Sequence, residues 1–390
     1  MKYMPTLSLV AFGLGCLCTV TRAETPQPLP LSPDQQEQLS ARRLGAAGQA
    51  QQELASRQAD ASGERIGGPA DIDGRNVERR RTVTYRIDCL DCSLPGVVVR
   101  PVKINNQGVV AANDISTGQG YVIAGGVLAP TPRVAGATSS TVSDINDAGH
   151  LVGVQANASS IVGGYLGWPG GVTLLQGPDG DLVRPSGINA ADQVCASTFQ
   201  RSVLYERGVA HALPAPPGQS ISWSTGINIS GHVVGGSYSG GTYSNPDGWR
   251  YAAGTITVLS PEFVSTYANA VNDLDEVAGS VDSYAAYWNA SGRLQILNGL
   301  PGFSTGMATG LNIHGTVVGI LAANNSSAYP RIEFVWDGGK PHDLNSLIQG
   351  GTTTGWVLNE ADSLNDRGAI VGVGLLHGES HAFVATPTMR

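Results

Sequence analysis

The chain has 390 residues, of which 14% are charged, 6% are aromatic and 52 are glycine. It is long enough for one large domain or two ordinary ones. A glycine-rich composition with little charge is typical of many short strands joined by tight turns. The formal net charge of −8 argues against nucleic acid as a partner, because phosphate binding needs clustered Lys and Arg.

Residues 1–23 have the pattern of a signal peptide. Lys2 gives a positive start, residues 7–20 are mainly apolar, and Thr21-Arg22-Ala23 resembles a cleavage site. We expect cleavage after Ala23. The mature protein is then secreted, periplasmic or at the cell surface.

A lipid anchor on Cys16 is the alternative for this segment, because Leu14-Gly15 precedes that cysteine. Gly13, however, stands where lipoprotein signals usually carry an aliphatic residue. The apolar run is too short and too rich in glycine for a spanning helix. No other stretch predicts a membrane span.

Residues 24–81 predict a flexible, partly helical tail. Residues 25–31 are Pro-rich and should be extended. Residues 32–35, Ser-Pro-Asp-Gln, have the pattern of a helix start, but the stretch to about residue 57 has too few large apolar residues for a buried stripe. Residues 60–78 are polar and predict no regular structure.

From Thr82 the sequence consists of seven repeats, each marked by an Asn that leads into a tight turn. The spacings between these anchors are 41, 43, 39, 44, 40 and 53 residues. A period of about 40–45 without helical periodicity predicts four-stranded propeller blades. The anchors are Asn105, Asn146, Asn189, Asn228, Asn272, Asn312 and Asn365.

Each anchor predicts a hairpin, as in residues 226–235. The Asn starts the turn by bonding its own backbone, and a Gly with positive φ closes the hairpin. Asp192 and Asp275 replace that Gly in two repeats, and Asp tolerates left-handed geometry better than most residues. The paired aliphatic residues after the turn, such as Val233 and Val234, should pack between blades.

Each repeat continues with a strand that holds an aromatic residue in most units, and then with a strand that ends in Leu. Only six Leu strands follow an aromatic strand, because the chain ends soon after Phe383. Residues 83–90 form the missing strand if the N-terminal end of the domain completes the last blade. We therefore predict an all-β fold over 82–390, a seven-bladed β-propeller with a closed ring and no open edge.

The repeat resembles the extracellular HAF-repeat family of bacterial exported proteins. Residues 225–236, 309–320 and 362–373 match its Gly-Ile-Asn-x-x-Gly-x-Val-Val-Gly pattern, and His381-Ala382-Phe383 matches the triplet that names it. The resemblance covers about residues 82–390. It implies export and a repetitive β fold, and it supplies no catalytic residues.

Cys89 and Cys92 have the spacing of a small disulfide in an oxidising compartment. Free thiols, a redox pair and a metal site are alternatives, but no second Cys or His pair follows at ligand spacing. Cys195 should be a buried, inert thiol. We predict no metal and no cofactor.

A catalytic motif is missing from the sequence. There is no Gly-x-Ser-x-Gly elbow, zincin motif or P-loop. His150 and His232 follow the turn Gly and should face solvent, and the Asn and Asp of the turns are better explained by turn chemistry than by calcium. The carboxylates Asp282, Glu333 and Asp337 are interpreted as ordinary strand-end charges.

The repeats differ most in their loops, and aromatic residues on polar loops suit carbohydrate or protein contact. Residues 236–247 form one such loop, and residues 345–357 account for the long last spacing. The candidate ligand-binding residues are Trp223, Tyr238, Tyr243, Tyr284 and Trp356.

The sequence thus favours an exported, monomeric, non-enzymatic binding or scaffold protein whose loops recognise a protein or a glycan. The alternative is an extracellular polysaccharide lyase or hydrolase with its site at the mouth of the central channel. A cluster of His, Tyr, Arg or carboxylates that converges from three or more blades would favour the enzyme. A third hypothesis places the function in the tail of residues 24–81.

Overall fold

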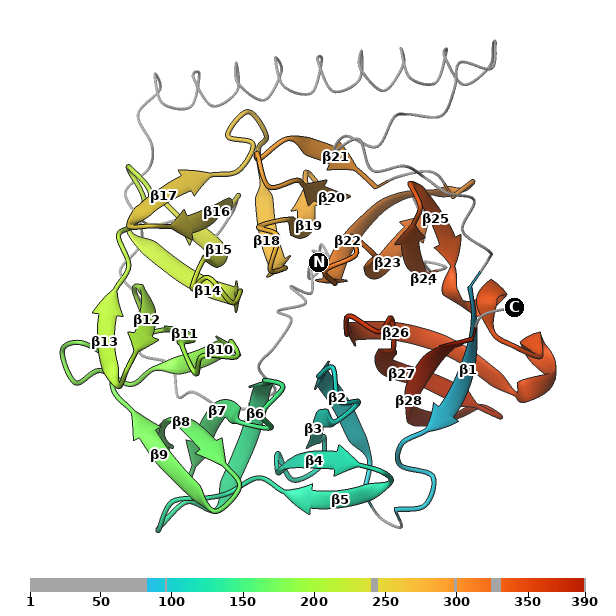
Figure 1. Cartoon of the computed structure of the whole chain (residues 1–390), viewed down its shortest axis with the longest axis horizontal. Coiled ribbons are helices and arrows are strands. Elements are labelled where there is room, and N and C mark those ends of the chain that lie inside the picture. Colours follow the sequence, from blue (N-terminus) through green and yellow to red (C-terminus); the bar gives the residue numbers. More distant parts are fainter. Residues whose placement is uncertain (1–82, 95–96, 240–244, 298–299, 324–330, 389–390) are drawn as a thin grey trace, which may run out of the picture.

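The computed structural model describes residues 83–94, 97–239, 245–297, 300–323 and 331–388. These residues form seven four-stranded antiparallel sheets, arranged as blades around a common axis (Figure 1). The predicted seven-bladed β-propeller is confirmed. The predicted signal peptide and tail lie outside the described residues. No helix within the described ranges is long and apolar enough to cross a membrane.

The first three blades follow the chain in order, each with its first strand nearest the axis (Figure 1). Blade 1 contains β2 (Val99–Ile104), β3 (Val110–Asp114), β4 (Gly120–Ala124) and β5 (Val127–Pro130). Blade 2 contains β6 (Ser139–Ile145), β7 (Leu151–Ala156), β8 (Ile161–Trp168) and β9 (Gly171–Leu175). Blade 3 contains β10 (Arg184–Ile188), β11 (Val194–Ser197), β12 (Ser202–Glu206) and β13 (Val209–Ala212).

The next three blades repeat this order. Blade 4 contains β14 (Ile221–Ile227), β15 (Val233–Tyr238), β16 (Asp247–Ala252) and β17 (Thr255–Val258). Blade 5 contains β18 (Thr266–Val271), β19 (Val277–Val281), β20 (Tyr284–Trp288) and β21 (Leu294–Ile296). Blade 6 contains β22 (Phe303–Leu311), β23 (Val317–Ala323), β24 (Arg331–Asp337) and β25 (Lys340–Asp343).

Blade 7 joins the two ends of the domain. It contains β26 (Trp356–Leu364), β27 (Ile370–Leu376), β28 (Glu379–Thr388) and, as its outer strand, β1 (Thr84–Cys89). The β1 and β28 strands pair antiparallel from Thr84 opposite Thr388 to Cys89 opposite Phe383. The N-terminal strand therefore closes the ring as predicted, and the β28 edge is covered.

The hairpin between the first two strands of each blade is built as predicted. In blade 4, Oδ1 of Asn228 accepts hydrogen bonds from the backbone N–H groups of Ser230 and His232, at 3.1 and 3.0 Å. Gly231 has a φ of 75°, and its counterparts Asp192 and Asp275 have φ values of 58° and 64°. The two Asp residues thus adopt the left-handed backbone that the turn requires.

A second glycine of the repeat is explained by a β-bulge in the first strand. The register between β14 and β15 shifts between Ser224 and Gly226, and the bulge brings the carbonyl of Trp223 against Gly235. A Cβ on Gly235 would lie 2.0 Å from that carbonyl oxygen. Small residues therefore occupy the seventh position after each anchor, namely Ala112, Gly153, Ala196, Gly235, Gly279, Gly319 and Gly372.

The apolar core lies mainly between blades. Val233 packs with Leu204 of blade 3 and with Trp249 of its own blade, whereas Val234 packs with Leu259 and with residues of blade 5. Both valines are fully buried. The prediction that the paired aliphatic residues pack between blades is confirmed, and each pair joins its blade to both neighbours.

The long last spacing is an insertion that covers the seam of the ring. Two 3-10 helices, η1 (Leu344–Leu347) and η2 (Gly351–Thr354), lie between blades 6 and 7. The backbone N–H of Gln349 donates to the carbonyl of Tyr85 in β1 at 2.8 Å. The insertion therefore holds the strand that closes the ring.

The alternating strand directions give the ring two distinct faces. The Asn turns and the turns between third and fourth strands lie on one face, here called the Asn face. The loops between second and third strands and the connections between blades lie on the other, here called the loop face. The connection between β7 and β8, in one of the regions where the repeats differ most, belongs to the loop face.

Candidate functional site

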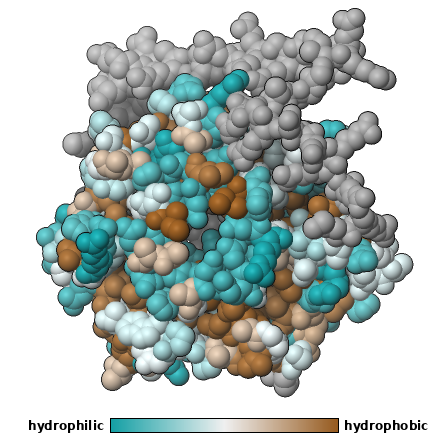
Figure 2. Space-filling model, in the orientation of Figure 1, coloured by the Kyte–Doolittle hydropathy of each residue, from teal (hydrophilic) through white to brown (hydrophobic). Residues whose placement is uncertain are grey.

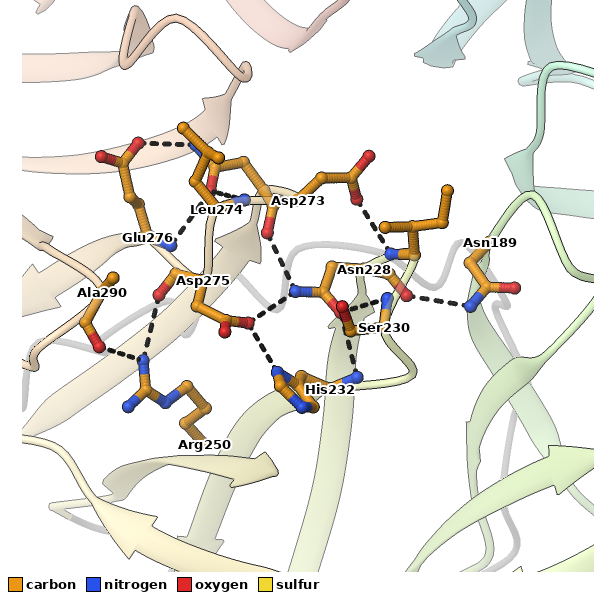
Figure 3. Close-up of polar contacts among 12 residues, drawn as sticks. Asn189, Asn228, Ser230, His232, Arg250, Asp273, Leu274, Asp275, Glu276 and Ala290 are labelled. Carbon is orange, nitrogen blue, oxygen red and sulfur yellow. Dashed lines mark hydrogen bonds and ion pairs between the residues drawn. The ribbon is translucent and has the colours of Figure 1, made fainter. Parts of the chain in front are cut away.

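The seven anchor residues do more than start turns, because they form a closed ring of hydrogen bonds. The side-chain amide of each anchor donates to the backbone carbonyl oxygen of the next anchor, at 2.8 to 3.2 Å, and all seven side chains are buried. Figure 3 shows two of these steps, from Asn189 to Asn228 and from Asn228 to blade 5. The ring locks the seven blades to one another on the Asn face.

His150 and His232, which were expected to face solvent, are only partly exposed, and each contacts an aspartate. Nδ1 of His150 lies 2.8 Å from Oδ1 of Asp192, and Nδ1 of His232 lies 2.6 Å from Oδ1 of Asp275 (Figure 3). Each histidine reaches the Asp that replaces the turn glycine in the next blade. That Asp also accepts the amide of the preceding anchor, Asn146 or Asn228. The exchange of Gly for Asp thus adds a link between blades.

Variable residues occupy one repeat position on the strands nearest the axis. This position lies five residues before each anchor, near the loop face, and none of its seven side chains is buried. We call this set the inner ring: Arg100, Thr141, Arg184, Trp223, Tyr267, Met307 and Glu360. A repeated scaffold therefore presents six different residue types at these seven positions around the axis.

Aromatic residues of blades 4 and 5 come together at this level. The rings of Trp223 and Tyr238 have centroids 4.7 Å apart and are tilted by 36°. The Trp223 ring also covers Gly236, where a Cβ would lie 2.2 Å from it. Tyr267, which is 38% exposed, forms a side-chain hydrogen bond with Tyr238. We call Trp223, Tyr238 and Tyr267 the aromatic shelf.

Burial raises the pKa of Tyr238, and the nearby Tyr267 raises it further. The phenol is therefore neutral at physiological pH and can donate or accept hydrogen bonds. Tyr267 was missed in the sequence, although it stands at the same repeat position as Trp223. Alignment of the repeats on their Asn anchors would have revealed it.

The other predicted ligand-binding residues have different positions. Tyr284 is half-buried at the start of β20, on the loop face of blade 5. Tyr243 lies outside the described residues. The expectation that Trp356 lies on a polar loop is wrong: it begins β26, is 6% exposed and packs edge-on against Phe383. The insertion over the seam folds it inward, where the apolar core gains the indole.

A second cluster of polar residues joins blades 6, 7 and 1. Arg100 of β2 forms an ion pair with Glu360 of β26 and lies 3.5 Å from Oδ1 of Asp362. Oε2 of Glu333, on β24, accepts the backbone N–H of Ala361 at 2.9 Å. Three carboxylates and one guanidinium thus converge from three blades. The interpretation of Glu333 as an ordinary strand-end charge is wrong, because its side chain is fully buried.

Burial raises the pKa of Glu333 to about 9 and the pKa of Asp362 to about 7. Neighbouring carboxylates add to the upward shift of both, while Arg100 opposes that of Asp362. Glu333 is therefore protonated at neutral pH. Separated pKa values are typical of acid–base chemistry, but a carboxyl that is fully buried cannot touch a substrate unless the blades move apart.

A shallow hollow of about 300 Å³ lies between the outer parts of blades 4 and 5. Arg250 lines it, together with Leu259, Glu262 and Leu294. The guanidinium of Arg250 is held by the backbone carbonyls of Asp275 and Ala290 (Figure 3). Because its donors already serve the scaffold, we assign this arginine a structural role.

The predicted disulfide between Cys89 and Cys92 is present. Cys195 is a buried free thiol, and burial raises its pKa to about 12. It is therefore inert as predicted. Asp91 and His381 lie beside the disulfide, a proximity that the separation of 290 residues concealed.

The surface is mixed in character. Figure 2 shows hydrophilic residues around the middle of the visible face, between separate hydrophobic patches. No protein-family model matches the sequence, and no curated protein matches it.

Several solved structures resemble the chain in fold. Virginiamycin B lyase from Staphylococcus aureus is 10% identical, with a TM-score of 0.46 over 77% of this chain and 99% of that chain. YCF48 bound to D1 peptide is 11% identical, with a TM-score of 0.47 over 78% and 97%. A puromycin-hydrolyzing peptidase from Mycobacterium tuberculosis is 12% identical, with a TM-score of 0.41 over 68% and 47%. Similarities this low carry no argument about function.

The seven closed blades define this chain as a seven-bladed β-propeller protein. Its conserved internal pattern builds the scaffold, and its variable positions form the inner ring and the loop face.

Proposed function

We propose that this chain is a non-enzymatic binding protein that recognises its ligand on the loop face, across the aromatic shelf. The observation that carries this proposal is the stacked pair of Trp223 and Tyr238 beside the exposed Tyr267. Rigid aromatic side chains offer a large contact area at a low cost in entropy. The Gly236 backbone below the indole and the neighbouring blade hold the rings in place before a ligand arrives.

Protein and glycan ligands both fit such a surface, and the shelf favours a glycan. Flat aromatic rings accept the apolar face of a sugar. Arg184 is exposed at the equivalent position of the preceding blade and offers hydrogen-bond donors toward the same part of the ring. Function on variable positions of a rigid scaffold is the common arrangement in repeat proteins.

The test measures ligand binding in two assays, a glycan array and a pull-down from envelope extract. Wild type, Trp223→Ala and Trp168→Ala are used as baits. Trp168 is the matched control, because it is also a partly exposed tryptophan but ends β8 on the Asn face. We expect Trp223→Ala to weaken binding by about tenfold or more, which corresponds to at least about 1.4 kcal/mol. Equal capture by wild type and Trp223→Ala would exclude the shelf as the site.

Export and membership of the HAF-repeat family belong to the same proposal. They are supported by the N-terminal pattern of residues 1–23 and by the triplet His381-Ala382-Phe383. Expression with the native N-terminus should give a mature protein that starts at Glu24 outside the cytoplasm, as read by N-terminal sequencing. Light scattering should show a monomer.

An extracellular carbohydrate-active enzyme is the second candidate, and the cluster of Glu333, Glu360, Asp362 and Arg100 favours it. Carboxylates with separated pKa values are what glycoside hydrolysis uses. Polysaccharides of different charge would be incubated with wild type and with Glu360→Gln, and new reducing ends or unsaturated products measured. Turnover by wild type and its loss in the variant would replace the binding proposal with the enzymatic one.

A further inference from the structure

Four potential metal ligands meet at the seam where the ring closes. Cys89 is the last residue of β1, Asp91 and Cys92 follow in the next turn, and His381 lies on β28. The two sulfur atoms, a carboxylate oxygen of Asp91 and a ring nitrogen of His381 all lie within 4.8 Å of one another. The set combines two sulfur ligands, one nitrogen ligand and one oxygen ligand.

Two of the distances between these atoms match the edges of a tetrahedral zinc site, and a third is shorter. Cys92 Sγ lies 3.7 Å from His381 Nδ1, Cys89 Sγ lies 3.5 Å from Asp91 Oδ1, and that oxygen lies 2.9 Å from His381 Nδ1. With ordinary zinc–ligand bonds, the edges of such a tetrahedron are about 3.3–3.7 Å long. Two edges must lengthen when zinc binds, namely the sulfur–sulfur bond and the 2.9 Å contact between Asp91 Oδ1 and His381 Nδ1.

The backbone holds the ligands in place before any ion arrives. The backbone N–H of Ala382 donates to both oxygens of Asp91 at 3.3 Å, and the N–H of Leu90 donates to the carbonyl of Ala382 at 2.9 Å. The Asp91 side chain is only 2% exposed, whereas Cys92 is exposed. A metal ion would enter from the Cys92 side and meet a fixed carboxylate and imidazole.

We propose that Cys89, Asp91, Cys92 and His381 form a redox-gated Zn²⁺ site. In the oxidised state the disulfide withdraws both sulfur ligands. A dithiol reductant supplies two electrons and two protons, which break the sulfur–sulfur bond and give two thiols, while the reductant becomes a disulfide. Zinc then displaces the two thiol protons and binds the thiolates, His381 and Asp91.

The two states differ in what they hold together. The disulfide joins residues that are three positions apart within one turn. A zinc ion would join that turn to His381, which lies 289 residues after Cys92. Zinc would therefore fasten β1 to β28 and stabilise the closed ring, which the disulfide alone does not do.

The test uses the full chain with Cys16, Cys18 and Cys195 replaced by serine, so that only Cys89 and Cys92 remain as thiols. Zinc alone is titrated against a chromophoric chelator, with and without a phosphine reductant. We expect one tightly bound Zn²⁺ per reduced chain and at least a hundredfold weaker binding by the oxidised chain. The midpoint of thermal unfolding should rise with zinc in the reduced chain only.

Variants separate the site from adventitious binding. Cys89→Ser with Cys92→Ser should bind no better than the oxidised chain, and His381→Gln should weaken binding by about 10- to 100-fold in the reduced chain. Circular dichroism verifies that each variant is folded. Co²⁺ should give the strong visible absorption of a tetrahedral thiolate complex in the reduced chain. Equal zinc affinity of the reduced chain and its double serine variant, or an octahedral Co²⁺ spectrum, would overturn the proposal.

Discussion

The side-chain amide of Asn365 donates to the backbone carbonyl oxygen of Asn105, 2.8 Å away, although 260 residues separate them in the chain. This contact completes the ring of seven anchor residues. The same side chain starts a turn within its own blade and bonds to the next blade. One residue type therefore specifies both the local hairpin and the contact between blades.

Substitution of Asn228 should separate these two roles. In Asn228→Asp, the carboxylate can still accept the N–H groups of its own turn but cannot donate to the carbonyl of Asn272. It would also face the carboxylate of Asp275, which lies 2.7 Å from the Asn228 amide. We expect losses of about 2–4 kcal/mol for Asn228→Ala and at least as much for Asn228→Asp at pH 7, measured by urea unfolding. A smaller loss in Asn228→Asp would show that the turn matters more than the ring.

The stability cost of replacing Asp275 should depend on His232. Its φ of 64° favours glycine, but its carboxylate accepts from Asn228 and contacts Nδ1 of His232 at 2.6 Å. Asp275→Gly should destabilise wild type by about 1–2 kcal/mol, because the lost contacts outweigh the relieved backbone.

In the His232→Ala background, the same exchange should cost much less. The difference between the two costs is the coupling energy of the pair, which a double-mutant cycle in urea measures. Asp192→Gly with and without His150→Ala is the matched repeat of the experiment in blades 2 and 3. Identical costs in both backgrounds would mean that the contact between His232 and Asp275 contributes nothing.

Glu333 should make stability depend on pH. Below about pH 4.5 its carboxyl is protonated in both the folded and the unfolded chain. As the pH rises, the unfolded chain ionises first, while burial keeps the folded side chain protonated up to a pKa of about 9. The free energy of unfolding should therefore fall with pH across this window, by up to about 1.4 kcal/mol per unit.

Glu333→Gln should remove the decrease in the free energy of unfolding between pH 7 and 9. A decrease at lower pH should remain, because the pKa of Asp362 is also raised, to about 7. Additional replacement of Asp362 by Asn should also remove the decrease in the free energy of unfolding at the lower pH values. The measurement is urea unfolding from pH 4 to 9. A wild-type profile without a slope above pH 7 would contradict the raised pKa of Glu333.

Removal of β1 should open the ring. A chain of residues 91–390 lacks the outer strand of blade 7 and exposes the edge of β28, which is a template for pairing with other chains. We expect a lower thermal midpoint and oligomers in size-exclusion chromatography. A chain of residues 83–390 retains β1 and serves as the control, which should behave as a folded monomer. Monomeric, equally stable behaviour of both chains would show that the strand is dispensable.

The sequence determined the architecture because the chemistry of each blade is local and repeated. An Asn followed by a residue able to adopt positive φ forms the same turn seven times, and the buried valines and aromatic residues recur at fixed distances from it. The count of strands even predicted that residues near 84–89 complete the last blade. Trp356 escaped this reasoning, since its environment depends on an insertion without a counterpart in the other repeats.

Which unlike residues meet depends on the packing of the blades. The ion pair of Arg100 with Glu360, the shelf that joins Trp223 to Tyr267, and the contact of Asp91 with His381 each join different blades or opposite ends of the domain. The repeat places Arg100, Glu360, Trp223 and Tyr267 at one equivalent position of their blades, but it does not show which side chains meet across neighbouring blades. Trp223 and Tyr267 meet because consecutive blades pack side by side. For Arg100 with Glu360 and Asp91 with His381, the proximity follows from the closure of the ring, which brings the two ends of the domain together.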